Sequence, residues 1–482
     1  MNSRLRTTAL ACALSTVLLG GCPFSEQSND PSPEPKDTQP LRLVVVDDPA
    51  LGAAIASEWQ AQTEQSLETE QMTAAELAQA KLLPGDIVLF PTGMLGHCIE
   101  GGLIVPLSDD LLAAPQFDRR DIFDQIRLRE MTWGNRTVAV SLGSPQILLA
   151  YRADLFEKLG LQPPADWAAY QELALKLAER AALGEAAPPD DQPWHATLEP
   201  LADGWAGQVL LARAAAYAMH PDQLSPLFNS DDAQPLIDRA PYVRALKELT
   251  AAAKVGGFAD TRLTPQEALA ELRAGHAAMA LGWPAPPAGK VADKETTTGT
   301  IRYALLPGAK QSYNFATKRW TTSESGEPTR VPVLACSGRL AAVTSNSAAR
   351  QRAESFVLWL GGKDASRQVA PRSSATAPYR QSQLREVELW TEGLDPGEAR
   401  QYGVTLAAAL SIPRVFPGLR LPGRLDYVAA LDKAVQQAAA EQAAPDEALQ
   451  HAAARWAEIT NAIGADKQQQ AILRSLSQAD LK

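Results

Sequence analysis

Residues 41–59 read LRLVVVDDPALGAAIASEW, and this stretch indicates the fold class. Leu41 to Val46 is a short apolar run, which is typical of a buried strand. Asp48 followed by Pro49 marks a helix start, because Asp caps free N–H groups and Pro fits the first turn. The apolar residues after them recur at the spacing of one helix face, at Leu51, Ile55 and Trp59.

A second predicted helix and strand come next along the chain. Thr73 and Glu76 have the spacing of a capping box, which opens a helix that Pro84-Gly85 ends. Asp86 to Phe90 then forms another buried strand. The chain therefore begins β-α-β, which favours an α/β fold with a parallel sheet and crossover helices.

The rest of the chain continues this alternation. Strands are expected at 137–142, 277–281, 300–305 and 331–343, the last one interrupted by Cys336-Ser337-Gly338. Helices are expected at 153–159, 206–219, 241–255, 425–440 and 445–462. The polar segment 310–330 is interpreted as an irregular surface excursion, and residues 467–482 as a polar tail.

Composition narrows the class of protein. The 482 residues suggest two to three domains at about 150 residues each. Hydrophobic residues make up 45% and charged residues 21%, which excludes a disordered or fibrous chain. The net charge is −11 without any basic stretch, so we expect no nucleic-acid partner.

The sequence lacks the motifs of several metal, cofactor and catalytic sites. The four cysteines and five scattered histidines make neither a disulfide scaffold nor a metal-ligand pattern. Phosphate-loop, dinucleotide and nucleophile-elbow motifs are missing, so we expect no metal, no cofactor and no enzymatic activity. Cys98 and Cys336 can pair in an oxidising compartment, but two buried, inert thiols are the preferred interpretation.

The N-terminus is interpreted as a targeting signal. Arg4 and Arg6 precede the apolar stretch Thr7 to Leu19, which is shorter than the about 20 residues that span a bilayer. This is the pattern of a secretory signal. Residues 19–22, Leu-Gly-Gly-Cys, resemble a bacterial lipobox, which implies a signal peptide over 1–21 and lipid attachment at Cys22.

The alternative at this position is ordinary signal cleavage with an incidental cysteine. Residues 22–40 are rich in Pro, Ser, Asp and Gln and are expected to be a flexible tether after the lipidated cysteine. The body is therefore expected outside the cytoplasm, on the periplasmic side of the membrane that holds the lipid.

A family resemblance rests on five segments in order. The most specific is 139–161, where a strand reaches Ser141 to Ser144 and is followed by Tyr151 and the run DLFEKLGL at 154–161. The other segments are 86–107, 275–284, 305–308 and 335–360. Together they resemble the extracellular solute-binding proteins of ABC importers, in the sugar-type group that includes maltodextrin-binding proteins.

That resemblance implies two α/β lobes with a ligand cleft between them, joined by crossing strands near 140–144 and 331–339. The expected N-terminal lobe is 41–140 plus 335–372. The expected C-terminal lobe is 141–334 plus 373–466. Clefts of this kind lie where the carboxyl ends of strands face a crevice.

The resemblance also implies a function. A monomeric binding subunit would capture a small polar solute, expected to be a sugar or oligosaccharide, and pass it to the permease subunits of an ABC importer. Two alternatives from other classes are an extracytoplasmic enzyme acting on polysaccharide and a ligand-binding component of a sensor.

Candidate ligand contacts come from the resemblance and from position. Trp283, held between Gly282 and Pro284 at a strand end, is expected to stack on a sugar, with a core tryptophan as the alternative. Trp205 is a weaker candidate for a second stacking face. The polar candidates near the expected cleft are Asp47, Asp48, Thr92, Gly93, Ser141, Ser144, Ser337, Arg339 and Arg372.

These polar candidates have alternatives too. Asp48 can simply cap a helix, and Ser141, Ser144, Ser337 and Arg339 can serve the crossing geometry instead of the ligand. The chain also departs from the family pattern at Pro91-Thr92-Gly93-Met94 and at Ala335-Cys336-Ser337-Gly338.

Overall fold

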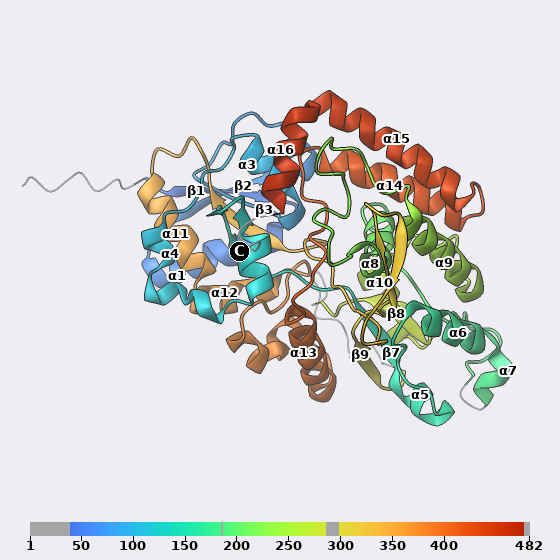
Figure 1. The fold of residues 1–482 in the computed structure, drawn as a ribbon. Coiled ribbons are helices and arrows are strands. Elements are labelled where there is room, and N and C mark those ends of the chain that lie inside the picture. Colours follow the sequence, from blue (N-terminus) through green and yellow to red (C-terminus); the bar gives the residue numbers. More distant parts are fainter. Residues whose placement is uncertain (1–38, 185–186, 286–297, 477–482) are drawn as a thin grey trace, which may run out of the picture. The chain divides into compact units, whose positions relative to one another are not determined.

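The computed structural model describes residues 39–184, 187–285 and 298–476 (Figure 1). Met1–Gln39 and Pro40–Lys482 are two separate units, and every described helix and strand lies in the second. The signal peptide, Cys22 and nearly all of the tether lie outside the described residues, so those interpretations stay predictions.

The first lobe is built on a five-stranded sheet in the order β2-β1-β3-β12-β6. Its strands are β1 (Leu41–Val46), β2 (Leu67–Met72), β3 (Ile87–Pro91), β12 (Arg339–Val343) and β6 (Val140–Ser141). Strand β1 runs parallel to β2 and β3, which confirms the parallel β-α-β start. Strand β12 is antiparallel to both β3 and β6, so a distant segment completes this sheet.

Helices cover this sheet as the capping signals predicted. Asp48 caps α1 (Pro49–Thr63), and Thr73 with Glu76 forms the capping box of α2 (Ala74–Gln79). Two later helices, α11 (Arg350–Gly361) and α12 (Lys363–Val369), pack on the same lobe. Figure 1 shows them beside α1.

The second lobe has a smaller, antiparallel sheet in the order β8-β7-β9. Its strands are β7 (Leu148–Arg152), β8 (Met279–Gly282) and β9 (Ile301–Ala304). The helices around it are α5 (Ala153–Leu159), α6 (Trp167–Ala178), α8 (Ala206–Ala218), α9 (Ala240–Gly256) and α10 (Pro265–Arg273). Their bounds confirm the predicted helices of this region to within two residues.

The C-terminal part adds α13 (Pro396–Leu410), α14 (Arg424–Ala439) and α15 (Pro445–Ile463). Helix α14 packs against α8, α9 and α15, and α13 packs against β9. The shorter elements include α3 (Leu95–Glu100), α4 (Asp109–Leu112), a π-helix (Ile126–Glu130), β4 (Thr132–Trp133), β5 (Arg136–Thr137), α7 (Arg180–Leu183) and a 3₁₀-helical segment (Ser382–Trp390).

Three segments differ from the sequence expectations. The predicted strand 331–343 is regular only over β12, because Ala335 and Gly338 have positive φ angles of 58° and 111°. Segment 310–330 contains the hairpin β10 (Gln311–Asn314) and β11 (Arg319–Thr322). Cross-strand contact between Tyr313 and Trp320 holds this hairpin together.

The expected polar tail is instead helical over α16 (Ala465–Ser475). Ala471 and Ile472 are buried, which gives this short helix an apolar face. Arg474 forms a two-point ion pair with Glu100 at the end of α3, with both N–O distances 2.6 Å. The chain's last described helix therefore rests on the first lobe, beside α3 in Figure 1.

The boundary between the lobes after residue 372 also differs from the expectation. Arg380 is fully buried and donates to the carbonyl oxygens of Phe117, Asp118 and Gly361, all in the first lobe. The first-lobe segment that begins with β12 therefore extends to at least residue 380.

Candidate functional site

Two crossing segments, residues 141–144 and 335–338, pass between the lobes next to each other. Leu142 N donates to Arg339 O at 2.9 Å, and Arg339 N donates to Gly143 O at 3.1 Å. Gly143 and Gly338 have φ angles of 120° and 111°, which residues with a side chain rarely adopt. A Cβ on Gly338 would also lie 2.6 Å from Thr92 Oγ1, so this close approach requires glycine.

Thr92 and Gly93 come directly after β3 at this crossing. Thr92 N donates to Gly338 O at 3.2 Å, while its fully buried Oγ1 has no hydrogen-bond partner. The side chain of Arg424 lies against Gly93, which leaves no room there for a Cβ. The structure thus places both predicted contact residues at the boundary between the lobes.

The three predicted serines hold backbone at the same crossing. Ser144 Oγ donates to Glu130 Oε1 at 2.7 Å and lies 3.3 Å from Ser337 O. Ser337 Oγ donates to Ala375 O at 3.4 Å, and Ser141 Oγ accepts from Gly143 N at 3.1 Å. These contacts match the alternative interpretation of crossing geometry, while their role toward a ligand stays a prediction.

Asp48 and Arg339 form a buried ion pair beneath the crossing. Asp48 Oδ2 accepts from Arg339 Nε at 2.9 Å and from Ser373 Oγ at 2.5 Å, while its Oδ1 caps α1 through Leu51 N. Burial lowers the pKa of Arg339, and the neighbouring carboxylate of Asp48 opposes that effect. Asp48 therefore has three partners within the protein.

The remaining polar candidates are Asp47 and Arg372, and the backbone oxygen of Asp47 accepts from Arg339 Nη2 at 3.1 Å. Asp47 is exposed, has a positive φ of 52°, and its carboxylate accepts from Ala74 N at 3.1 Å at the start of α2. Arg372 is also exposed. Neither side chain is drawn into the contacts that surround the crossing segments.

Trp283 lies at the end of β8 and reaches toward the first lobe. Its side chain is 1% exposed, its Nε1 donates to Ser374 O at 3.2 Å, and its ring centroid lies 5.3 Å from that of Trp205. Ser374 is the neighbour of Ser373, the residue bonded to Asp48. The two predicted tryptophans therefore form one aromatic pair at the lobe boundary, with Trp205 only half-buried.

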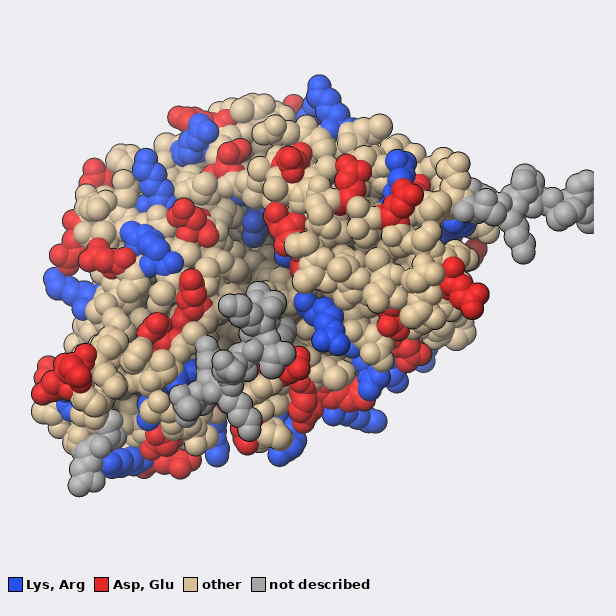
Figure 2. All heavy atoms as spheres, turned by 180° about the vertical axis from the view of Figure 1, so that it is seen from behind, with Lys and Arg blue, Asp and Glu red and all other residues tan. Residues whose placement is uncertain are grey.

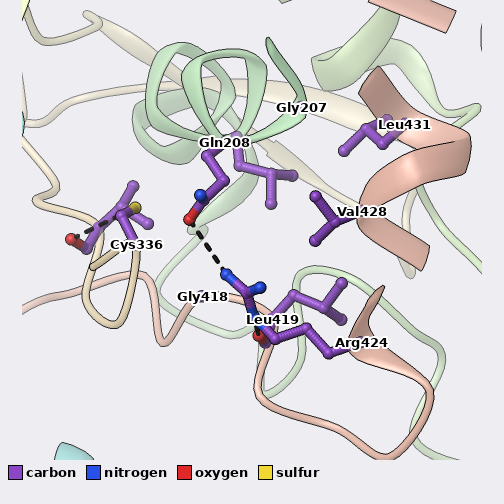
Figure 3. Close-up of a pocket in the computed structure, with 10 residues that line it drawn as sticks. Gly207, Gln208, Cys336, Gly418, Leu419, Arg424, Val428 and Leu431 are labelled. Carbon is purple, nitrogen blue, oxygen red and sulfur yellow. Dashed lines mark hydrogen bonds between the residues drawn. The ribbon is translucent and has the colours of Figure 1, made fainter. Parts of the chain in front are cut away.

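Arg424, which the sequence reasoning missed, is the first residue of α14. Its Nε donates to Leu419 O at 3.0 Å and its Nη2 to Gln208 Oε1 at 3.4 Å (Figure 3). No carboxylate in the described ranges forms an ion pair with it. Burial lowers its pKa, and the carboxylate of Asp432 acts against that effect. Only a lone Arg after Pro422-Gly423 marks it in the sequence.

A cavity of about 10 Å³ lies beside Arg424, which is room for about one water molecule. Gln208, Leu211, Val333, Cys336 and Val428 are among the residues that line it. Figure 2 shows that the body is hollowed near the middle of one face, with basic side chains at the floor of the hollow. The polar hydrogens of Arg424 that have no partner make it suited to bind hydroxyl or carboxylate oxygens.

Metal-ligating side chains do not gather in the described part of the chain. Over residues 39–184, 187–285 and 298–476, no group of three His, Cys, Asp or Glu side chains could hold a metal ion. Cys98 and Cys336 are free and buried, and burial raises the pKa of the Cys336 thiol to about 12. Such thiols are poor nucleophiles.

None of the helices in the described ranges has both the length and the apolar character needed to cross a membrane.

The comparisons with known proteins agree on one class. Residues 53–366 match the family described as bacterial extracellular solute-binding protein. No curated protein matches the chain. The match covers more than half of the 482 residues, and the chain belongs to this family of extracellular solute-binding proteins.

Solved structures of two-lobed binding proteins share the fold at low sequence identity. An ABC transporter solute-binding protein of Agrobacterium radiobacter K84 in complex with ribitol has a TM-score of 0.63 and 18% identity, over 87% of this chain and 98% of its own. One of Agrobacterium vitis S4 with bound D-mannitol has a TM-score of 0.61 and 17% identity, over 88% and 99%. The maltose-bound MalE3 of T. maritima has a TM-score of 0.61 and 16% identity, over 86% and 99%.

Proposed function

We propose that this chain is the substrate-binding component of an ABC importer for a sugar or polyol. It captures the solute between the two lobes and delivers it to membrane permease subunits. The observation that carries the proposal is the meeting of Trp283 and Arg424, from the second lobe, with Ser374 and Gly93 of the first lobe. An aromatic face and a guanidinium with free donors together suit the C–H faces and hydroxyls of a carbohydrate.

The ligands named for similar structures support the solute class. Ribitol, D-mannitol, maltose and α-D-tagatose are all small polyhydroxylated molecules. We propose that the chain binds a solute of this class and catalyses no reaction. Asp48, the best-buried acidic candidate, already has Arg339, Ser373 and the end of α1 as partners, so its carboxylate is poorly suited to act as a general acid or base.

Anchoring is a separate part of the proposal. The Leu-Gly-Gly-Cys run at 19–22 supports lipid attachment at Cys22, and the family is extracellular. The binding body would then work as a monomer tethered beside its permease. Lipid labelling and membrane fractionation of the parent and Cys22→Ser test this. A parent that takes up no lipid label contradicts it.

A thermal-shift screen tests the solute class. The full chain is melted alone and with ribitol, D-mannitol, D-tagatose or maltose. A solute that binds only the folded state and is present at 100 times its Kd adds about 2.7 kcal/mol to stability. We expect at least one of the four to raise the Tm. No rise with any of them at millimolar concentration contradicts the sugar or polyol proposal.

A further inference from the structure

Glu130, a residue with no signal in the sequence, connects both crossing segments. It ends the π-helix Ile126–Glu130 of the first lobe and is fully buried. Its Oε1 accepts from Ser144 Oγ at 2.7 Å, on the outward crossing, and from Ala335 N at 2.9 Å, on the returning crossing. One carboxyl oxygen therefore holds the two segments that link the lobes.

The other oxygen of this carboxyl is isolated. Glu130 Oε2 is buried and has no hydrogen-bond partner. Among the residues that the structure places, none forms an ion pair with Glu130. The charged or titratable groups that act on it are Arg420, from the segment before α14, and Cys336, on the returning crossing. Arg420 itself donates to the carbonyl oxygens of Arg129 and Ser475.

The backbone held by Glu130 is the part of the crossing that has unusual geometry. Ala335 has a φ of 58°, a left-handed conformation that an alanine adopts only when its surroundings hold it there. Gly338, three residues on, has a φ of 111°. Rotation of one lobe against the other requires φ/ψ changes at a few such positions. Glu130 is therefore bonded to the returning crossing at a position able to absorb lobe movement.

We propose that Glu130 is a positioning residue of the crossing, and that the gain and loss of one proton by its carboxyl makes solute affinity depend on pH. This inference rests on the proposed function, since it needs binding that is coupled to lobe movement. With the lobes in contact, as here, the carboxyl is dry and its neutral form is favoured. This role requires that lobe opening move one of the donors Ser144 and Ala335 off the carboxyl and admit water, which would favour the charged form.

The electrostatics of the site agree with that direction. Burial raises the pKa of Glu130 to about 7, although the donors Ser144 and Ala335 and the charge of Arg420 all act to lower it. A contact geometry that takes up a proton is strengthened by acid, because linkage is reciprocal. Solute affinity should therefore be higher at pH 5.5 than at pH 8.

The first test is calorimetric affinity of the full chain at pH 5.5, 6.5, 7.5 and 8. The probe is whichever of ribitol, D-mannitol, D-tagatose and maltose gives the largest thermal shift. We expect the Kd of the parent to rise about tenfold across this range, as for one group whose pKa differs by one unit between the two forms. The Kd of Glu130→Gln should change less than twofold over the same pH range. A flat parent profile, or an unchanged slope in Glu130→Gln, overturns the proposal.

Two further variants sharpen the test. Glu354→Gln makes the same change in charge at a buried site of α11 that is bonded to Arg350, away from the crossing, and should keep the parent's slope. Ser144→Ala removes one donor to the carboxylate and should move the midpoint of the profile to higher pH. A midpoint that stays in place, or moves down, counts against the proposal even if Glu130→Gln fails to fold.

Solute-free X-ray scattering separates this inference from the proposed function. The radius of gyration of the parent should increase from pH 5.5 to pH 8, and that of Glu130→Gln should not. If none of the four solutes binds, the proposed solute class fails, while the scattering still decides whether Glu130 controls the crossing. Equal scattering of the parent at both pH values overturns the inference.

Discussion

Two buried glutamates, one inside the second lobe and one at the crossing, show how differently the protein treats a carboxyl. Glu199 and Arg213 are both fully buried and form an ion pair. Tyr170 OH also donates to Glu199 at 3.1 Å, and the guanidinium of Arg213 lies 4.0 Å from the ring centre of Trp167. Glu130 is equally buried but has no cationic partner among the described residues, and its Oε1 accepts only from a hydroxyl and a backbone N–H. In both glutamates the other carboxyl oxygen is buried without a hydrogen-bond partner.

The difference shows which part of the structure is held in one arrangement and which part can change with pH. A buried charge pair is costly to assemble but very costly to break, so it holds a lobe in one arrangement. A buried carboxyl that has no charged partner and a pKa near neutral can gain or lose its proton within the ordinary pH range. The Glu199–Arg213 pair is therefore expected to respond less to pH than Glu130 does, although burial raises the pKa of Glu199 as well.

The largest expected effect comes from breaking the interior pair. Glu199→Ala leaves Arg213 buried without its carboxylate, so we expect a loss of about 3–5 kcal/mol of stability. Urea unfolding at pH 7 measures this. A matched control is Glu458→Gln, which removes a surface pair with Arg455 and should cost at most about 0.5 kcal/mol. Equal losses of stability in the two variants would contradict the view that the buried pair holds the lobe in one arrangement.

The next effect is the pH dependence of stability at Glu130. Its pKa of about 7 in the folded chain lies above its ordinary value of 4.5, so the folded state binds more protons between these values. Stability contributed by this group is present below pH 4.5 and is lost as pH rises to 7. Glu130→Gln should therefore exceed the parent by about 3 kcal/mol at pH 8 and match it near pH 4.5. Melting curves over this range measure it, and a variant that is destabilised at pH 8 contradicts it.

A third prediction concerns the aromatic pair at the lobe boundary. Trp283→Ala should weaken solute binding by about thirtyfold, or about 2 kcal/mol, because an anchoring ring is lost from a desolvated position. Trp283→Phe keeps a ring but loses the bond to Ser374 O, and should lose less. Trp320→Ala, in the β10–β11 hairpin, is the control and should keep the parent's affinity. Calorimetry on the four chains decides, and an unchanged Kd in Trp283→Ala removes this residue from the site.

The smallest effect is expected at the C-terminal helix. Glu100→Gln weakens the two-point pair with Arg474, which is partly exposed, so we expect a loss of only about 1 kcal/mol, reduced further by salt. Hydrogen exchange of the α16 amides should speed up, while exchange in α8 should stay as in the parent. Unchanged exchange in α16 would show that its other contacts, among them buried Ala471 and Ile472 and the hydrogen bonds of Gln468, are enough to hold the helix in place.

Local signals in the sequence predicted much of the fold. The helix cap at Asp48 and the capping box at Thr73 both form as expected, because each depends on residues within one turn. Strand β2 was missed because its sequence, LETEQM, is polar and lies at the exposed edge of the sheet. Helix α16 was missed because its contacts are with distant parts of the chain, such as the ion pair of Arg474 with Glu100, 374 positions earlier. No local pattern reveals such contacts.

The candidate site was predicted in outline but not in detail. Thr92, Gly93 and Trp283 were placed at the lobe boundary through resemblance, and they lie there. Glu130 and Arg424 have no motif around them, since their roles come from contacts with distant segments such as Ala335 and Gln208. Asp47 could not be separated from Asp48 by sequence, because one positive φ angle directs their side chains to different partners.

Solution scattering with and without solute tests the central claim most directly, namely that this chain captures a sugar or polyol between two lobes. The full chain is measured at pH 6.5, alone and with a calorimetrically saturating concentration of the solute that gives the largest thermal shift among ribitol, D-mannitol, D-tagatose and maltose. We predict a smaller radius of gyration with solute than without it, because lobe movement accompanies capture. Saturating binding that leaves the radius of gyration unchanged would contradict the account.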